Sequence, residues 1–325
     1  MSRTSWAAAA VLCLASAVTG CGPAHSTTLP VVTGAFGADP LITLPARKPP
    51  GGLVIRTLSE GPGPVVRPGD YVLFDVAAKV WAGDRLVLDT FANHQPQGLP
   101  LPAGLPAWRH LAGQRVGSRV LEVVPPRDGF GRRGDASVNV TGTDTLVFVF
   151  DILAAVPTAG HASGTAAGYR PGTGLPQVTM SAHGPVVTVP PRMAPPKTLV
   201  TRMLVAGHGP RLVPGETVVT QFTGALWRTG AVFDSSWQHG DPQSFVLGSG
   251  QVIAGWNQGL AGQRVGSRVL LVIPPRLGYG KAGNPPAITG KDTLISWQTF
   301  LAPPTPGPGP AGAWASGTRV TGGSS

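Results

Sequence analysis

Cysteine is nearly missing from this chain, with 2 in 325 residues, at positions 13 and 21. A framework of disulfides, which stabilises many small exported domains, is therefore excluded. Aromatic residues (6%) and charged residues (12%) are also scarce, while hydrophobic residues make up 42%. The chain thus has enough apolar side chains for packed cores, and its length suggests about two domains.

Acidic residues are the scarcer charge, with 15 Asp and Glu against 25 Lys and Arg and a formal net charge of +10. The basic residues form no run and do not alternate with aromatics, so we expect no nucleic-acid partner. The histidines lie apart, at positions 25, 94, 110, 161, 183, 208 and 239, without the spacing of metal ligands. No Ser/His/Asp signature or phosphate-binding loop is present, so neither a metal nor a cofactor is predicted.

Long apolar runs are missing everywhere except near the N-terminus. Residues 6–18 form an apolar segment too short to span a bilayer comfortably, preceded by Arg3 and followed by Val18-Thr-Gly-Cys21. A small residue directly before such a Cys resembles the lipobox of bacterial lipoproteins. We therefore predict a signal peptide over 1–20, a lipid on Cys21, and anchoring to the outer face of the bacterial cell membrane. The alternative is an ordinary signal peptide with an incidental cysteine.

Glycine (46) and proline (35) are abundant, and they gather in three stretches. Residues 21–51 are predicted to be a tether, residues 156–196 a linker, and residues 303–325 a disordered tail. Between them the sequence repeats itself. LAGQRVGSRVL occurs at 111–121 and again, unchanged, at 260–270, and flanking segments such as 53–70 and 199–216 also align. The repeat unit is about 100 residues, which suits a whole domain.

The two units, which we call the first unit (52–155) and the second unit (197–302), are predicted to be mainly β-strand. Runs such as 217–227, 268–275 and 292–301 are β-branched and partly alternating. One segment, 251–260, has apolar residues at helical spacing, and Gly262 can end that helix. The expected fold class is α+β, with each unit an antiparallel β-sheet wrapped around one short α-helix.

The second unit resembles the FKBP family, the macrolide-binding peptidyl-prolyl isomerases. The similarity covers 197–302 and includes FTGAL, GAVFDSS and FVLGSGQVIAGWNQGL in the order and spacing of the family. It implies isomerase (rotamase) activity that assists the folding of exported proteins. Its implied partners are proline-containing unfolded or exported polypeptides and macrolide inhibitors.

The resemblance also assigns pocket residues. The catalytic positions that it implies are Phe233, Asp234, Ile253, Trp256 and Tyr279, and the substrate-binding positions are Phe222, Val252, Ile288 and Ser296. Trp256 would lie under the proline ring, and the Ile253 N–H would hold a substrate carbonyl. Three residues depart from the family: Phe222 replaces a Tyr, Ser296 replaces a Phe, and Gln243 replaces an aromatic residue.

The first unit has lost much of this pattern. Val76 stands in place of Phe222, Leu88 in place of Phe233, and Phe130 in place of Tyr279, although Asp89 is retained. Its helix region, LPAGLPAWRHLAGQ, contains prolines that fit poorly in a helix. We expect the first unit to be inactive and to bind clients or position the second unit. The duplicated phrase is then a turn and strand of the scaffold rather than a catalytic motif.

Two other functions are compatible with the sequence. The protein could be a non-catalytic FKBP-like chaperone or binding module, which Ser296 and Gln243 favour and the intact aromatic positions disfavour. It could also be a scaffold that contacts cell-wall material through its basic surface and Pro-rich tail.

Overall fold

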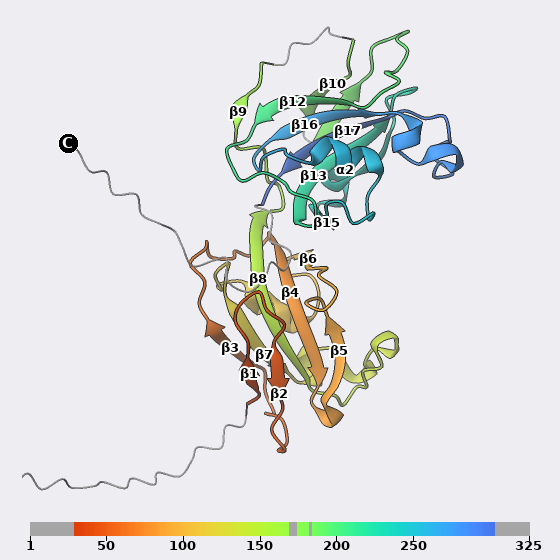
Figure 1. Ribbon diagram of the computed structural model, residues 1–325. Coiled ribbons are helices and arrows are strands. Elements are labelled where there is room, and N and C mark those ends of the chain that lie inside the picture. The colour runs from red at the N-terminus through yellow and green to blue at the C-terminus, as the bar shows by residue number, and fades with distance from the viewer. Residues whose placement is uncertain (1–28, 169–173, 182–183, 303–325) are drawn as a thin grey trace, which may run out of the picture.

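The computed structural model describes residues 29–168, 174–181 and 184–302 (Figure 1). The predicted signal peptide, Cys21 and the predicted tail lie outside these residues. In the described ranges, no helix combines the length and apolar character needed to cross a bilayer.

The first unit is built on an antiparallel sheet with strand order β3-β7-β8-β4-β5, in which β6 also pairs with β4. The strands of this sheet are β3 (Val54–Ser59), β4 (Asp70–Val80), β5 (Arg85–Asp89), β6 (Gln97–Pro100), β7 (Arg119–Val124) and β8 (Leu146–Pro157). Its helices are short 3₁₀ turns: η1 (Ala82–Asp84), η2 (Pro106–Leu111), η3 (Pro126–Asp128), η4 (Gly131–Arg133) and η5 (Ala136–Val138). The long central strands β4 and β8 are buried along most of their length because both faces of the sheet are covered.

The second unit repeats this topology, with strand order β14-β13-β17-β16-β12-β9 and β15 paired with β13. The strands are β9 (Thr165–Ala166), β12 (Val200–Ala206), β13 (Thr217–Leu226), β14 (Val232–Ser235), β15 (Gln243–Val246), β16 (Arg268–Ile273) and β17 (Leu294–Phe300). The helices are α1 (Ser236–His239), α2 (Ala254–Leu260), η6 (Pro275–Leu277) and η7 (Gly280–Ala282). Strands β12, β16, β17, β13 and β14 occupy the places of β3, β7, β8, β4 and β5. The α+β class is therefore confirmed.

The duplicated phrase connects the helix of each unit to the strand that follows it. In both copies its second glycine lies in the left-handed region, at φ 91° for Gly117 and φ 84° for Gly266, where residues with a Cβ are strained. Ser118 Oγ accepts a hydrogen bond from the Gly61 N–H at 2.9 Å, and Ser267 Oγ accepts one from the Gly207 N–H at the same distance. The phrase thus makes the same joint twice, which agrees with its interpretation as a scaffold element.

The helix over the concave face differs between the units. In the second unit, α2 is brought close to the sheet by Gly255 and Gly259, whose added Cβ atoms would lie 2.4 Å from Ile273 and 2.7 Å from Leu271. When the two units are aligned on the leucine that begins the duplicated phrase, the first unit has Pro106 and His110 at these positions. The proline and the larger side chain do not allow the same approach, and the expected α-helix is replaced in this unit by the 3₁₀ helix η2.

The predicted tether and linker differ from expectation, because each contains a hairpin. β1 (Val31–Thr33) pairs with β2 (Leu41–Thr43), and β10 (Gln177–Ser181) pairs with β11 (Gly184–Thr188). Each hairpin packs its apolar side chains on the outer face of the following sheet, where Ile42 and Val187 are buried. The indole N–H of Trp81 donates to the Arg47 carbonyl and that of Trp227 to the Met193 carbonyl. The duplication therefore includes the hairpins.

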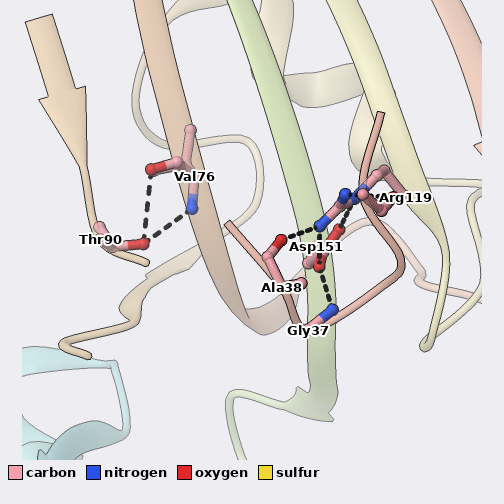
Figure 2. A network of polar contacts seen from close by, with 7 residues as sticks. Gly37, Ala38, Val76, Thr90, Arg119 and Asp151 are labelled. Carbon is pink, nitrogen blue, oxygen red and sulfur yellow. Dashed lines mark hydrogen bonds and ion pairs between the residues drawn. The ribbon is translucent and has the colours of Figure 1, made fainter. Parts of the chain in front are cut away.

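The connection between β1 and β2 is tied to the first sheet by a buried ion pair (Figure 2). Arg119 Nε lies 2.6 Å from Asp151 Oδ1, and Arg119 Nη2 lies 2.8 Å from Asp151 Oδ2. The Gly37 N–H donates to the same carboxylate at 2.6 Å, and the guanidinium donates to the carbonyls of Gly34 and Ala38. Among the described residues the second sheet has no such pair: the equivalent Arg268 lies over the Trp297 ring and donates to Thr299 Oγ1.

Candidate active site

A cavity of about 180 Å³ lies between α2 and the concave face of the second sheet. It collects nearly all the residues that the family resemblance singled out. The predicted residues on its lining are Phe222, Phe233, Asp234, Val252, Ile253, Trp256, Tyr279 and Ser296. They come from β13, β14, the residues just before α2, α2 itself, the loop before η7, and β17, so only the folded sheet brings them together.

The floor of the cavity is the indole of Trp256, which is held by two phenylalanines. The Phe222 ring meets it edge-on, with centroids 5.1 Å apart and planes at 71°, and the Phe245 ring lies 5.5 Å away at 46°. Such tilted contacts are the favoured geometry of aromatic pairs and fix the ring orientation. Phe222 therefore keeps a packing role although it lacks the hydroxyl of the tyrosine found at this position in the family.

The polar rim is formed by Asp234 at the end of β14. Its carboxylate lies 3.7 Å from His239 Nε2 in α1, and both side chains are about half exposed. The adjoining serines hold this segment on β13: Ser236 Oγ accepts from the Phe222 N–H at 2.8 Å, and Ser235 Oγ lies 2.9 Å from Thr223 Oγ1. The acid is thus presented to the cavity by a well-bonded strand end.

Ile253, on the cavity lining just before α2, carries a backbone donor. Val252 and Ile253 precede the helix rather than forming part of it, and Ile253 is its N-terminal capping residue. The first N–H groups of a helix have no acceptor within the helix. Within the described chain, the Ile253 N–H has no protein acceptor, so it is available to a bound carbonyl.

The base of the cavity contains small residues. Gly224 pairs with Ser296 across β13 and β17, and a Cβ on Gly224 would lie 2.6 Å from the Phe233 ring. The Ser296 hydroxyl is buried and accepts from the Gln298 amide at 3.2 Å. Gly224 thus lets the Phe233 ring pack directly against β13, and Ser296 places a small side chain beside it on the lining.

One predicted residue is placed elsewhere, and several were missed. Ile288 is 2% exposed and belongs to the buried core rather than to the cavity lining, because its N–H and C=O both pair with Asn284 and fix the loop against the core. Phe245 was missed, although it follows the exposed Gln243 by two residues and so lies on the same face of β15. Phe245 supports Trp256 without lining this cavity; the unpredicted lining residues are Gly224, Gln251, Ile273, Leu294 and Ile295.

The corresponding space in the first unit is filled. Trp108 from η2 packs against Phe74, Phe148 and Phe150, with ring centroids 5.7–5.8 Å apart. Phe148 occupies the place of Ser296 and lies opposite Ala78, which replaces Gly224. Large side chains thus enter where the second unit has its smallest ones. This packing explains why the scaffold persists without an open pocket.

Comparison with known proteins agrees with this geometry. The family model for FKBP-type peptidyl-prolyl cis-trans isomerase matches residues 209–296. An FK506-binding protein of Streptomyces anulatus is 43% identical over 104 residues, which are 32% of this chain and 83% of the relative. A probable FK506-binding protein of Corynebacterium glutamicum is 38% identical over 100 residues, 31% of this chain and 82% of the relative.

A further relative and a solved structure are also similar to this chain. The peptidyl-prolyl cis-trans isomerase FKBP15-2 of Arabidopsis thaliana is 54% identical over 88 residues, 27% of this chain and 53% of the relative. The crystal structure of AtFKBP13 is 32% identical, with 34% of this chain and 95% of that chain covered, at a TM-score of 0.31. From the high identity over most of the two bacterial relatives, the chain belongs to the FKBP-type peptidyl-prolyl cis-trans isomerase family.

Proposed function

We propose that the protein is a peptidyl-prolyl cis-trans isomerase whose activity belongs to the cavity of the second unit. The observation that carries this proposal is the Trp256 floor, fixed by Phe222 and Phe245, with Phe233 as a wall and Asp234 at the rim. A proline ring is a flat apolar group, and the indole face offers it a surface of matching size. Among the described residues that line the cavity, Asp234 at the rim is the only charged one.

This arrangement suits the chemistry of the X–Pro bond. Rotation about a peptide bond is opposed by a barrier of about 18–20 kcal/mol because amide resonance keeps it planar. No covalent bond has to form, so neither a nucleophile nor a general base is required. An apolar cavity disfavours the charge separation of the planar amide, and donors placed at the flanking carbonyls favour the twisted one. The Ile253 N–H and the Tyr279 hydroxyl on the lining are the donors in this proposal.

The first unit is proposed to have no isomerase activity. Trp108, Phe148 and Phe150 occupy its concave face, and Ala107 stands where the repeat would place the Trp256 floor. In this proposal it helps the second unit to bind clients. The clients are unfolded or newly exported polypeptides that contain proline.

The proposed location is the outer face of the cell membrane, with the chain anchored through acylated Cys21. It rests on the N-terminal sequence. Replacing Cys21 by alanine in the producing cell should move the protein from the membrane pellet to the soluble fraction and abolish incorporation of a labelled fatty acid. A wild-type protein that incorporates no labelled fatty acid would contradict the proposed anchor.

The test of activity is isomerisation of a short proline peptide by the full chain. Phe233→Ala/Asp234→Ala should lower kcat/KM at least about tenfold, because it removes a wall and the polar rim of the cavity. The matched control is Leu88→Ala/Asp89→Ala, the same pair in the first unit, which should leave kcat/KM unchanged. Circular dichroism confirms that each variant is folded.

The alternative is a non-catalytic binding module, and a specific observation favours it: Ser296 and Gln243 replace aromatic residues of the family at the base and rim. A folded wild-type chain that binds proline peptides without accelerating their isomerisation would establish this alternative.

A further inference from the structure

A second, larger hollow adjoins the isomerase cavity and lies between the two units. Its volume is about 570 Å³, and it shares Phe222, Asp234, Val252 and Trp256 with the isomerase cavity. The opposite wall comes from the first unit, chiefly from Gln97 and Pro100 at the two ends of β6. We call this hollow the inter-unit groove. Because Trp256 lines both spaces, a chain bound at Trp256 would lie next to this groove.

The wall from the first unit is held in place by specific contacts. Tyr71 Oη lies 3.0 Å from Ser244 Oγ on β15, and a Cβ on Gly98 would lie 2.1 Å from that hydroxyl, so the glycine makes room for it. An apolar cluster drawn from both units, which includes Leu73 and Val219, packs beside this contact. In Figure 1, β6 and β15 lie where the two units meet. The groove is therefore a built feature of the tertiary structure.

The groove has the chemistry of a site for an extended polypeptide. β6 pairs with β4 and β15 pairs with β13, each at the side of its sheet, and strand edges are common binding sites for extended chains. The lining is rich in side-chain amides and hydroxyls, which donate to and accept from a peptide backbone: Gln95, Gln97, Gln243, Gln251, Thr217 and Ser244.

The charge of the groove is opposite to that of the whole chain. Its lining, in the described residues, includes Asp234 and Asp241 and neither Lys nor Arg, although the chain carries a formal net charge of +10. Complementary charge sets partner choice more than raw affinity. We propose that the inter-unit groove binds the part of the client next to the proline and selects clients with Lys or Arg there. The inference rests on the proposed function. In it, the first unit, whose own pocket is filled, forms the second wall of the substrate site.

The test compares peptides with one proline core and different flanks. The full chain is assayed at pH 8 and low salt with a short unflanked peptide, an arginine-flanked peptide and a glutamate-flanked peptide. We expect kcat/KM to be about tenfold higher for the arginine flank than for the glutamate flank, since two solvent-facing charge pairs are each worth a factor of about three. High salt should reduce this ratio.

Two variants test the two walls separately. Asp241→Lys should bring the ratio to about one or below, and Gln97→Lys, on the first unit, should also lower it several-fold. The matched control is Asp128→Lys on η3, outside the groove lining, which should leave the ratio unchanged. Because the readout is a ratio between two substrates of one variant, a general loss of catalysis cancels.

The outcomes separate this inference from the proposed function. Equal turnover of both flanked peptides would overturn the groove and leave the isomerase intact. A flank preference that Gln97→Lys does not alter would overturn the role of the first unit. If the short peptide is not turned over, the proposed function fails, and fluorescence anisotropy with the same flanked peptides decides the groove: tighter binding of the arginine flank supports it and equal binding overturns it.

Discussion

Glu122 of the first unit is predicted to destabilise the folded protein at neutral pH. It lies on β7, is fully buried, and neither carboxylate oxygen has a hydrogen-bond partner in the described part of the chain. Its cross-strand neighbours are Ile55 and Phe148, and Leu271 stands at the equivalent position of the second sheet. Burial in this apolar environment raises the pKa of Glu122 from an ordinary value of 4.5 to about 8.

The size and sign of the effect follow from that pKa. Between about pH 4.5 and pH 8 the folded state holds a proton at Glu122 that the unfolded state has released. The free energy of unfolding therefore falls as pH rises through this window and levels off above it. At about 1.4 kcal/mol for each pH unit, the loss is about 5 kcal/mol across the window and about 3 kcal/mol by pH 7. Glu122→Leu should recover about 3 kcal/mol at pH 7 and add the burial of a leucine.

Hydrogen exchange of the full chain measures this locally. The opening free energy of β7 and β8 is followed at several pH values, with β16 and β17 of the second sheet as the internal reference. Glu122→Gln, which cannot ionise, is the control that isolates this carboxyl from others. The reasoning is refuted if wild type and Glu122→Gln show the same pH dependence in β7 and β8, or if Glu122→Leu does not stabilise these strands at pH 7.

Three further predictions concern packing and charge. Gly224→Ala should lower kcat/KM for a short peptide at least about tenfold, because the new Cβ would lie 2.6 Å from the Phe233 ring. The same clash should destabilise the second unit by about 1–3 kcal/mol. Unchanged turnover would contradict the assigned cavity. Asp151→Asn should destabilise the first unit by about 3–5 kcal/mol, since it leaves the Arg119 guanidinium buried without its carboxylate. Urea unfolding measures this change. A decrease in the free energy of unfolding below about 1 kcal/mol would argue against a buried ion pair. Gly266→Ala should cost about 1–2 kcal/mol in the same assay because φ there is 84°, whereas Gly51→Ala, outside any positive-φ position, should have little effect.

Local patterns were enough to predict much of the fold. The duplicated phrase is kept in a first unit that has lost the pocket pattern, and this contrast indicated a scaffold element. In the structure its second glycine has a positive φ in both copies, and its serine accepts a hydrogen bond from a distant glycine N–H. The replacements Val76 and Leu88, and the prolines around Trp108, indicated a degenerate first pocket. In the structure, Trp108 packs against Phe148 and Phe150 in the corresponding space.

The two hairpins could not be predicted in the same way. Strands β1 and β2 are three residues each, too short to show a periodic apolar pattern. Their stability comes from tertiary burial of a few side chains, such as Ile42 against the outer face of the first sheet. These segments are rich in Pro and Gly, which favoured a tether and a linker. Such a composition indicates turns, but it carries no information about which side chains pack on the sheet.

The sequence by itself determined the family, the α+β class and most of the cavity residues, because the order of motifs along one unit carries that information. Only the tertiary structure decided which aromatic rings hold Trp256, why Trp108 fills the first pocket, and that Gln97 and Asp241 border one groove. These residues are far apart in the chain, and their proximity depends on strand register and on the packing between the two units. Such distances are not encoded in any local pattern, since side chains distant in sequence meet only when whole sheets are assembled.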